Sequence, residues 1–150
     1  MIMEKRTIIK SLRINYVVSF VAALVVLLAF ELGFIEKGLL AKAISSTTLY
    51  VMQVATVLLT VSLIPLAIKG FTSSLEKAKG LPEADILKLF CKRSLQRIFL
   101  LFIVVVFSEF VYYALGYEGA LYCGVLGYGF MIYCFPTEMV LDQYLADNKE

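Results

Sequence analysis

The sequence predicts an all-α membrane protein with four transmembrane helices in a bundle. Hydrophobic residues make up 61% of the chain and charged residues 17%, against about 45–50% and about 25% in soluble domains. The apolar residues fall into long blocks with the charges between them, which is the pattern of a bilayer-spanning chain. We therefore expect residues 1–150 to form a single four-helix transmembrane domain.

The first two apolar blocks, residues 14–35 and 46–68, are long enough to cross the membrane. A bilayer core of ~30 Å takes about 20 helical residues. The basic N-terminal segment resembles the start of a signal peptide, but the first block is too long and no small-residue cleavage site follows it, so we expect a retained helix. The second block contains Pro65 near its end, and Lys69 with Gly70 is expected to close it.

The third block belongs to one long predicted helix that starts outside the membrane. Pro82 suits a first helical turn, and Glu83 and Asp85 favour the positive end of the helix dipole. No helix breaker follows before Gly116. We expect the first part of this helix to extend into the cytoplasm from a basic loop, residues 69–97, and its later part, 98–116, to span the membrane.

The fourth block, residues 120–135, is the shortest and ends at Pro136. The tail that follows carries apolar residues at helical spacing. It is predicted to form a short amphipathic C-terminal helix, on the membrane surface or against the cytoplasmic loop; the apolar residues are Val140, Leu141, Tyr144 and Leu145.

Lysine and arginine set the predicted orientation. Four precede the first span and seven lie in the 69–97 loop. The loop between the first two spans has only Lys37 and Lys42, and the loop between the last two has none. Because basic loops stay on the cytoplasmic side, both termini are expected in the cytoplasm, in a multi-pass protein of the cell inner membrane.

Several classes of site are excluded or unsupported by the sequence. There is no histidine, and the three cysteines form no C-x-x-C pair. The net charge of +2 is too small to indicate a nucleic-acid partner. No catalytic, metal or cofactor motif is present, so we expect neither an enzyme nor a cofactor.

Small residues on the fourth span indicate close helix packing. Gly116, Ala120, Gly124 and Gly127 follow one another in steps of four, four and three. Helices in a bilayer approach most closely at such residues. The stripe suits either the interior of a bundle or the seam of a homo-oligomer.

Glu109 is the most informative polar residue, since it lies near the middle of the third span. A charged side chain there costs roughly 2.5–3.5 kcal/mol on insertion scales. Tyr112 and Tyr113 follow it on the same side of the helix, and Gln53 and Thr56 lie at a comparable depth on the second span. We expect these residues to cluster, either as a proton- or cation-binding site or as a protonated carboxyl that bonds neighbouring helices.

Glu31 lies about one turn from the outer end of the first span. Its side chain can reach the interface by snorkelling. If it points inward instead, Glu31 and Glu109 would both edge an outward-facing cavity, and this pairing is the basis of a transport hypothesis.

The basic loop could contact anionic lipids, which attract each Lys or Arg by about 1 kcal/mol, although the orientation rule already accounts for these charges. The cytoplasmic part of the third helix is unusually apolar. It could pack on the tail helix, lie on the membrane or bind a partner protein; the residues are Ile86, Leu87, Leu89, Phe90 and Cys91.

The end of the fourth span carries a family resemblance. It resembles small four-span bacterial inner-membrane proteins of unknown activity, through Tyr133, Cys134, Phe135, Pro136, Thr137 and Glu138. The resemblance implies an inner-membrane location and no activity. Small multidrug transporters also have four short helices and a membrane glutamate, but the longer loop 69–97 and the outer position of Glu31 make this an analogy only.

The sequence leaves the function open between two main hypotheses. The first is an accessory or interaction component of a membrane assembly. The alternative is a small oligomeric proton- or cation-coupled transporter or channel that uses Glu109, with Glu31. A membrane-embedded enzyme ranks third, because no nucleophile–base pair is present.

Overall fold

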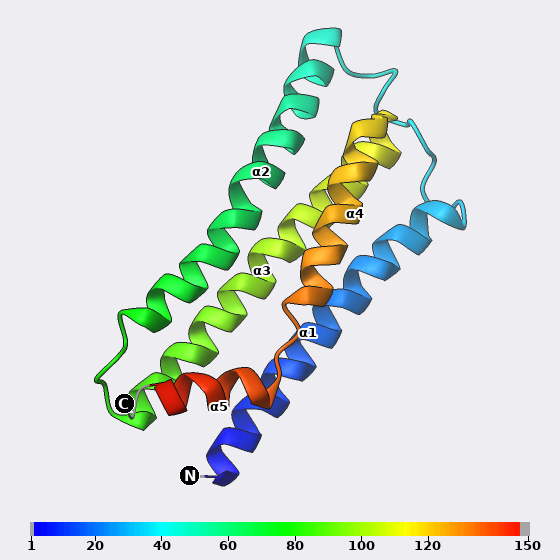
Figure 1. Cartoon of the computed structure of the whole chain (residues 1–150). Coiled ribbons are helices and arrows are strands. Elements are labelled where there is room, and N and C mark those ends of the chain that lie inside the picture. The colour runs from blue at the N-terminus through cyan, green and yellow to red at the C-terminus, as the bar shows by residue number, and fades with distance from the viewer. Residues whose placement is uncertain (1, 148–150) are drawn as a thin grey trace.

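The structure, a computed structural model, describes residues 2–147, which contain five α-helices and no strand. The first four helices run alternately up and down, each antiparallel to the one before it, and the last lies across one end of them (Figure 1). Their bounds are α1 Ile2–Glu31, α2 Ser46–Glu76, α3 Glu83–Leu115, α4 Glu118–Tyr133 and α5 Glu138–Asp147. The all-helical prediction is confirmed for this part of the chain.

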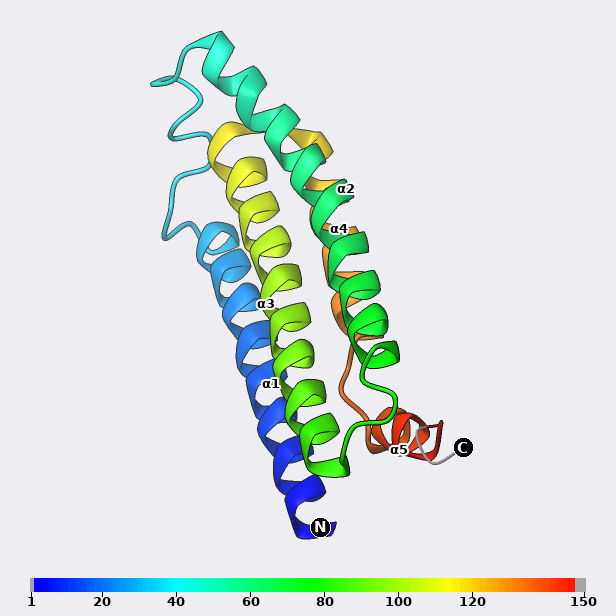
Figure 2. The ribbon, with the colours of Figure 1, turned by 90° about the vertical axis from the view of Figure 1, so that its left-hand side faces the viewer.

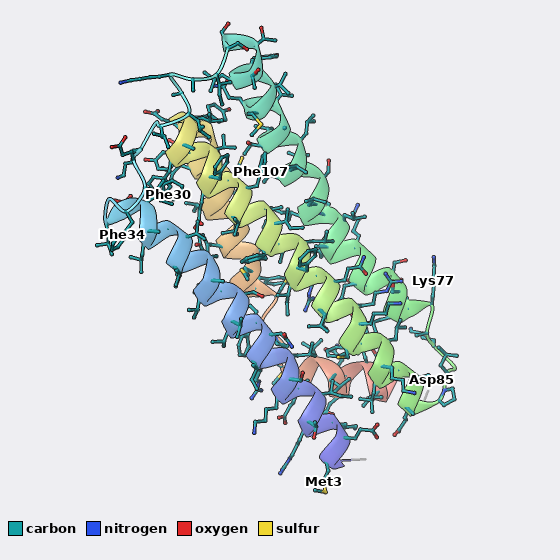
Figure 3. The ribbon with its side chains drawn as sticks, turned by 180° about the vertical axis from the view of Figure 1, so that it is seen from behind. Met3, Phe30, Phe34, Lys77, Asp85 and Phe107 are labelled. Carbon is teal, nitrogen blue, oxygen red and sulfur yellow. The ribbon has the colours of Figure 1, made fainter. Side chains whose placement is uncertain are left out.

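Helix α3 is central, with α1, α2 and α4 packed against it (Figure 2). The start of α1, the α2–α3 connection and α5 lie at one end of the bundle, here called the terminal end. The opposite end, here called the loop end, carries residues 32–45 and the α3–α4 turn. Figure 3 shows Phe30 and Phe34 at the loop end and Lys77 and Asp85 at the terminal end.

Helix α2 is longer than the sequence predicted. Its start at Ser46 is capped by Ser45, whose hydroxyl accepts from the Thr48 amide at 3.3 Å. The prediction that Lys69 and Gly70 close it was wrong, because α2 continues to Glu76. A glycine inside a helix costs only about 1 kcal/mol, and burial of the apolar residues that follow offsets this.

The ends of α3 follow the predicted signals. The helix begins at Glu83 directly after Pro82 and ends at Leu115. Gly116 then adopts φ +70°, the left-handed conformation that glycine takes without a steric penalty. The last three residues of the predicted tail, 148–150, lie outside the described residues.

The lengths and composition of the helices indicate a membrane protein. Helices α1, α2 and α3 are each long and apolar enough to cross a bilayer. Helix α4 has 16 residues, or about 24 Å, and meets the same criterion only together with α5, from which it is bent by 64°. The described residues therefore contain three candidate spans, or up to four.

Helix α5 covers the apolar part of α3 at the terminal end. Leu141 and Leu145 are buried there, and Val140 and Tyr144 pack against the same cluster. The amphipathic tail helix is thus present, and it lies against the 69–97 region. The cluster, here called the terminal cluster, contains Ile9, Leu12, Phe71, Leu75, Ile86, Leu87, Phe90, Leu141 and Leu145.

Candidate functional site

Glu109 lies in a small cavity between α1, α3 and α4. Its side chain belongs to the buried face of α3, with only 5% of the residue exposed. The cavity has a volume of about 90 Å³. Among the residues that line it with Glu109 are Leu27, Ser108, Tyr112, Tyr113, Gly124 and Tyr128.

The Glu109 carboxyl is only half satisfied. The Tyr128 hydroxyl donates a hydrogen bond to Oε1. Glu109 Oε2 and the neighbouring Ser108 Oγ are buried and have no hydrogen-bond partner in the described part of the chain. Since buried polar atoms are nearly always bonded, a free carboxyl oxygen in a cavity indicates a place for a bound proton, cation or water.

The small residues of α4 bring Tyr128 to Glu109. A Cβ atom on Gly127 would lie 2.8 Å from Val105 Cγ2, and one on Gly124 would lie 3.6 Å from Ser108 Cβ. Ala120, also on this face, is fully buried. The stripe thus packs against α3 within one chain, whereas Gly116 lies outside α4 and ends α3.

The structure does not bring Gln53 and Thr56 to this cavity. The Thr56 hydroxyl is buried and donates to the Met52 carbonyl of its own helix at 2.8 Å. Gln53 is half-buried, and neither residue lines the cavity. Both residues belong to α2, which contributes nothing to the lining, and a comparable depth does not fix which side of a helix a residue faces.

Sequence reasoning missed Tyr128 and Ser108. Tyr128 follows Gly124 by four residues and so lies on the same face of α4 as the small-residue stripe. This spacing was the available signal. It predicts that Tyr128 faces whichever helix the stripe packs against.

Glu31 is linked to the same cavity through Tyr113. The Tyr113 hydroxyl donates to Glu31 Oε1 at 2.5 Å, and Lys37 Nζ lies 3.1 Å from Oε2. The Tyr113 ring stacks on Phe30 with centroids 4.9 Å apart. Glu31 itself does not line the cavity, so Tyr113 is the residue that connects the loop end with the surroundings of Glu109.

Toward the terminal end, the surroundings of the cavity are aromatic and apolar. The Tyr128 ring meets Phe20 edge to face at 5.7 Å. Tyr16, Ile98 and Met131 form a buried cluster of α1, α3 and α4. Polar side chains therefore lead from Glu109 toward the loop end, whereas the residues described above on the terminal side form an aromatic and apolar layer.

No protein family, curated protein or solved structure matches this chain. The function is therefore argued from the site itself.

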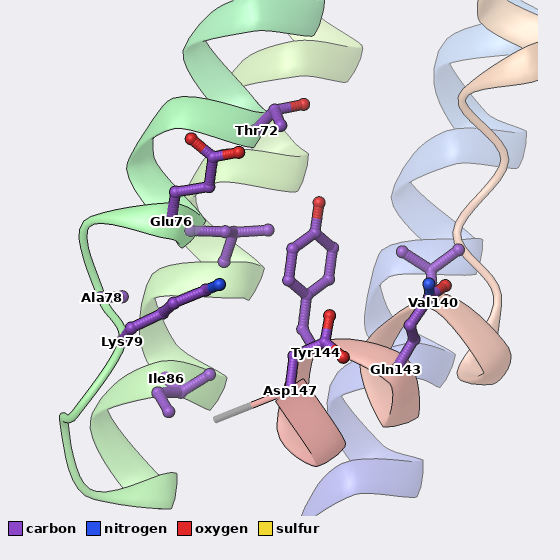
Figure 4. A pocket seen from close by; sticks show the side chains of 10 residues that line it. Thr72, Glu76, Ala78, Lys79, Ile86, Val140, Gln143, Tyr144 and Asp147 are labelled. Carbon is purple, nitrogen blue, oxygen red and sulfur yellow. The ribbon is translucent and has the colours of Figure 1, made fainter. Parts of the chain in front are cut away.

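A second pocket lies at the terminal end, between the last turns of α2 and α5 (Figure 4). It has a volume of about 290 Å³ and a mixed polar lining, in which Glu76 and Asp147 accompany Lys79. In Figure 4 the Tyr144 hydroxyl points along α2 toward the level of Thr72. In the described residues, no group of three or more His, Cys, Asp or Glu side chains could hold a metal ion.

Proposed function

We propose that the protein spans the bacterial inner membrane four times, through α1 to α4, with the terminal end in the cytoplasm. Two basic segments predict this orientation, one before the apolar part of α1 and one in residues 69–97, which comprise the end of α2, its connection to α3 and the start of α3. Both segments lie at the terminal end. The only lysine or arginine residues at the loop end are Lys37 and Lys42. A chain that crosses the bilayer an even number of times has both termini on one side, which agrees with this arrangement.

The shortness of α4 is compatible with a fourth span. Its 16 residues extend about 24 Å. The non-helical residues 134–137 continue it before α5 turns away. We place α5 at the cytoplasmic interface, because its apolar side packs on the terminal cluster while Met139 and Asp142 are exposed.

We further propose that Glu109 is the proton- or cation-binding residue of a small transporter. The observation that carries this is the buried carboxyl with one free oxygen in a cavity. A charged carboxylate at this depth must be paired or neutralised. In the described residues no basic side chain forms an ion pair with it, so an external proton or cation would have to supply the balance.

The side chains around the site support access from the loop end. Tyr113 connects the cavity to Glu31 and Lys37, which are exposed. On the terminal side the packing is apolar. A transporter in this state would accept its ion from outside, and release to the cytoplasm would require α1 or α4 to move relative to α3.

Glu109→Gln tests the role of the carboxyl without removing its hydrogen bond, because an amide oxygen still accepts from Tyr128. We expect the variant to melt like the wild type in detergent and to lose proton-coupled or cation flux in liposomes. Glu36→Gln is the matched control, since Glu36 is an exposed carboxylate at the same end. Normal flux in folded Glu109→Gln would end the proposal.

A direct probe is labelling by a hydrophobic carbodiimide, which modifies protonated carboxyls in the bilayer. Labelling of Glu109 should fall as the pH rises and should be slowed by a transported cation. Labelling that is constant at every pH at which the protein stays folded would identify a structural carboxyl instead.

An accessory role is the second candidate. Helices α1 and α2 are largely exposed along their apolar parts. In the apolar 18-residue stretch of each helix, only 17% of the residues are buried in α1 and 22% in α2. These faces can contact lipid or the helices of a partner. The cytoplasmic part of α3 offers less surface, because α5 covers it. Crosslinking in native membranes distinguishes the two, since a stoichiometric partner crosslinked to α1 or α2 would favour the accessory role.

A further inference from the structure

Two arginines of α3, one helical turn apart, line a cavity against α2. The cavity has a volume of about 110 Å³ and is separate from the pocket of Glu109. Its lining includes Leu66, Gly70 and Phe71 of α2 and Arg93, Gln96 and Arg97 of α3. No carboxylate is among the lining residues.

Both arginines are held in place but incompletely bonded. Arg97 Nη2 donates to the Cys134 carbonyl at 3.3 Å, and its guanidinium lies 3.9 Å from the centroid of the Phe71 ring. Arg93 Nη1 donates to Gln96 Oε1 at 3.0 Å. The Nε atoms of both arginines are buried and have no hydrogen-bond partner in the described part of the chain.

These unpaired donors indicate a missing anion. A buried donor without an acceptor costs roughly 1–3 kcal/mol. Neither arginine forms an ion pair with a carboxylate of the described residues. The guanidinium group matches the geometry of phosphate oxygens particularly well.

We propose that this cavity binds the phosphate of an anionic phospholipid. The arginines directly precede the proposed span 98–116, at the level of the cytoplasmic headgroups. Leu66 and Leu100 also line the cavity, and Leu66 is 58% exposed, so an acyl chain can continue along the α2 surface. The inference rests on the proposed placement in a bilayer and is independent of the role of Glu109.

Gly70 and Lys92 allow two separate tests of the site. A substitution at Gly70 changes the space in the cavity, and a substitution at Lys92 changes the charge near it. A Cβ atom on Gly70 would meet no atom within 4 Å, so a larger side chain there would occupy the cavity. Lys92 precedes Arg93 in α3 but is exposed and does not line the cavity. It therefore carries the same charge at the same depth, outside the site.

The experiment is native mass spectrometry of the purified chain equilibrated with equal amounts of phosphatidylglycerol and phosphatidylcholine. The wild type should retain one phosphatidylglycerol in preference. Arg93→Gln should lower the ratio of the two bound lipids at least about tenfold, because it removes a charge-assisted hydrogen bond to the phosphate in addition to the charge. Lys92→Gln should leave the ratio unchanged, and a loss equal to that of Arg93→Gln would show diffuse attraction and overturn the site.

Gly70→Leu should reduce phosphatidylglycerol binding without changing any charge. Its melting temperature should equal or exceed that of the wild type, because leucine is a better helix former than glycine. If this variant retained as much phosphatidylglycerol as the wild type, the proposal would be overturned. It would also be overturned if inorganic phosphate displaced the lipid from the wild type, because the site would then belong to the free anion. A chain that does not fractionate with membranes would instead contradict the proposed function.

Discussion

The Tyr128 hydroxyl of α4 donates its hydrogen bond to Oε1 of Glu109 on α3. This bond joins the shortest of the four bundle helices to the central one. It satisfies one carboxyl oxygen and leaves Oε2 unpaired beside the cavity. The hydrogen bond has a structural role, whereas the free oxygen is open to a ligand. Variants of Tyr128 and of Glu109 can test these two roles separately.

Tyr128→Phe should destabilise the protein by about 1–3 kcal/mol, because it leaves a buried carboxyl without its donor. The measurement is thermal unfolding in detergent. Tyr122→Phe is the control, since Tyr122 is 70% exposed on the same helix. Equal melting temperatures of the two variants would show that the bond contributes nothing to stability.

Gly127→Ala should weaken the packing of α4 on α3. The added methyl would lie 2.8 Å from Val105 Cγ2, and overpacking of this kind typically costs about 1–3 kcal/mol. Gly129→Ala is the matched change, because a Cβ there meets no atom within 4 Å. We expect a lower melting temperature for Gly127→Ala alone. Equal behaviour of both variants would contradict the close approach.

Detachment of α5 should expose Cys91. This thiol packs against the terminal cluster, outside the proposed span 98–116, and burial raises its pKa. Opening the cluster with Leu141→Ser should lower that pKa toward its ordinary value and increase the reactive thiolate at neutral pH. Maleimide labelling of the Cys91 peptide, followed by mass spectrometry, should therefore become faster.

Met139→Ser provides the control for this experiment, because Met139 is 80% exposed on the same helix. Its labelling rate should equal that of the wild type. If Leu141→Ser also left the rate unchanged, the burial of Cys91 in the terminal cluster would not depend on α5, contrary to this prediction.

The proposed orientation predicts the labelling of new cysteines in intact cells. Lys42→Cys at the loop end should react with a membrane-impermeant maleimide added outside. Lys77→Cys at the terminal end should react only after the membrane is opened. Both lysines are exposed, so burial does not bias the comparison. The reverse pattern would invert the topology, and labelling of both sites from outside would show that α2, the one helix between them, does not cross the membrane.

Much of the helical layout could be predicted from local signals. Pro82 and Gly116 bound α3 because each imposes a backbone conformation that does not depend on distant contacts. The closure of α2 at Gly70 could not be predicted in this way. Phe71 and Leu75 are buried in the terminal cluster, and that burial prolongs the helix.

The site was predicted in part. Glu109 was identified by its depth, and Tyr112 and Tyr113 line its cavity as their spacing suggested. Gln53 and Thr56 were predicted to lie at the same depth as Glu109 but do not line its cavity, and Tyr128 takes the place expected for them. Spacing along one helix fixes relative faces within that helix, whereas partners from other helices depend on packing.

The sequence by itself determined that the chain is helical, where its long apolar segments lie and which residues interrupt them. Hydropathy and helix signals are properties of short stretches, so they can be recognised in the sequence without knowledge of distant contacts. Only the tertiary structure decided the rotation of each helix about its axis. That rotation places Tyr128 on Glu109 and α5 on the terminal cluster, because it is set by the fit of Gly124 and Gly127 against α3 and by burial among residues far apart in the chain.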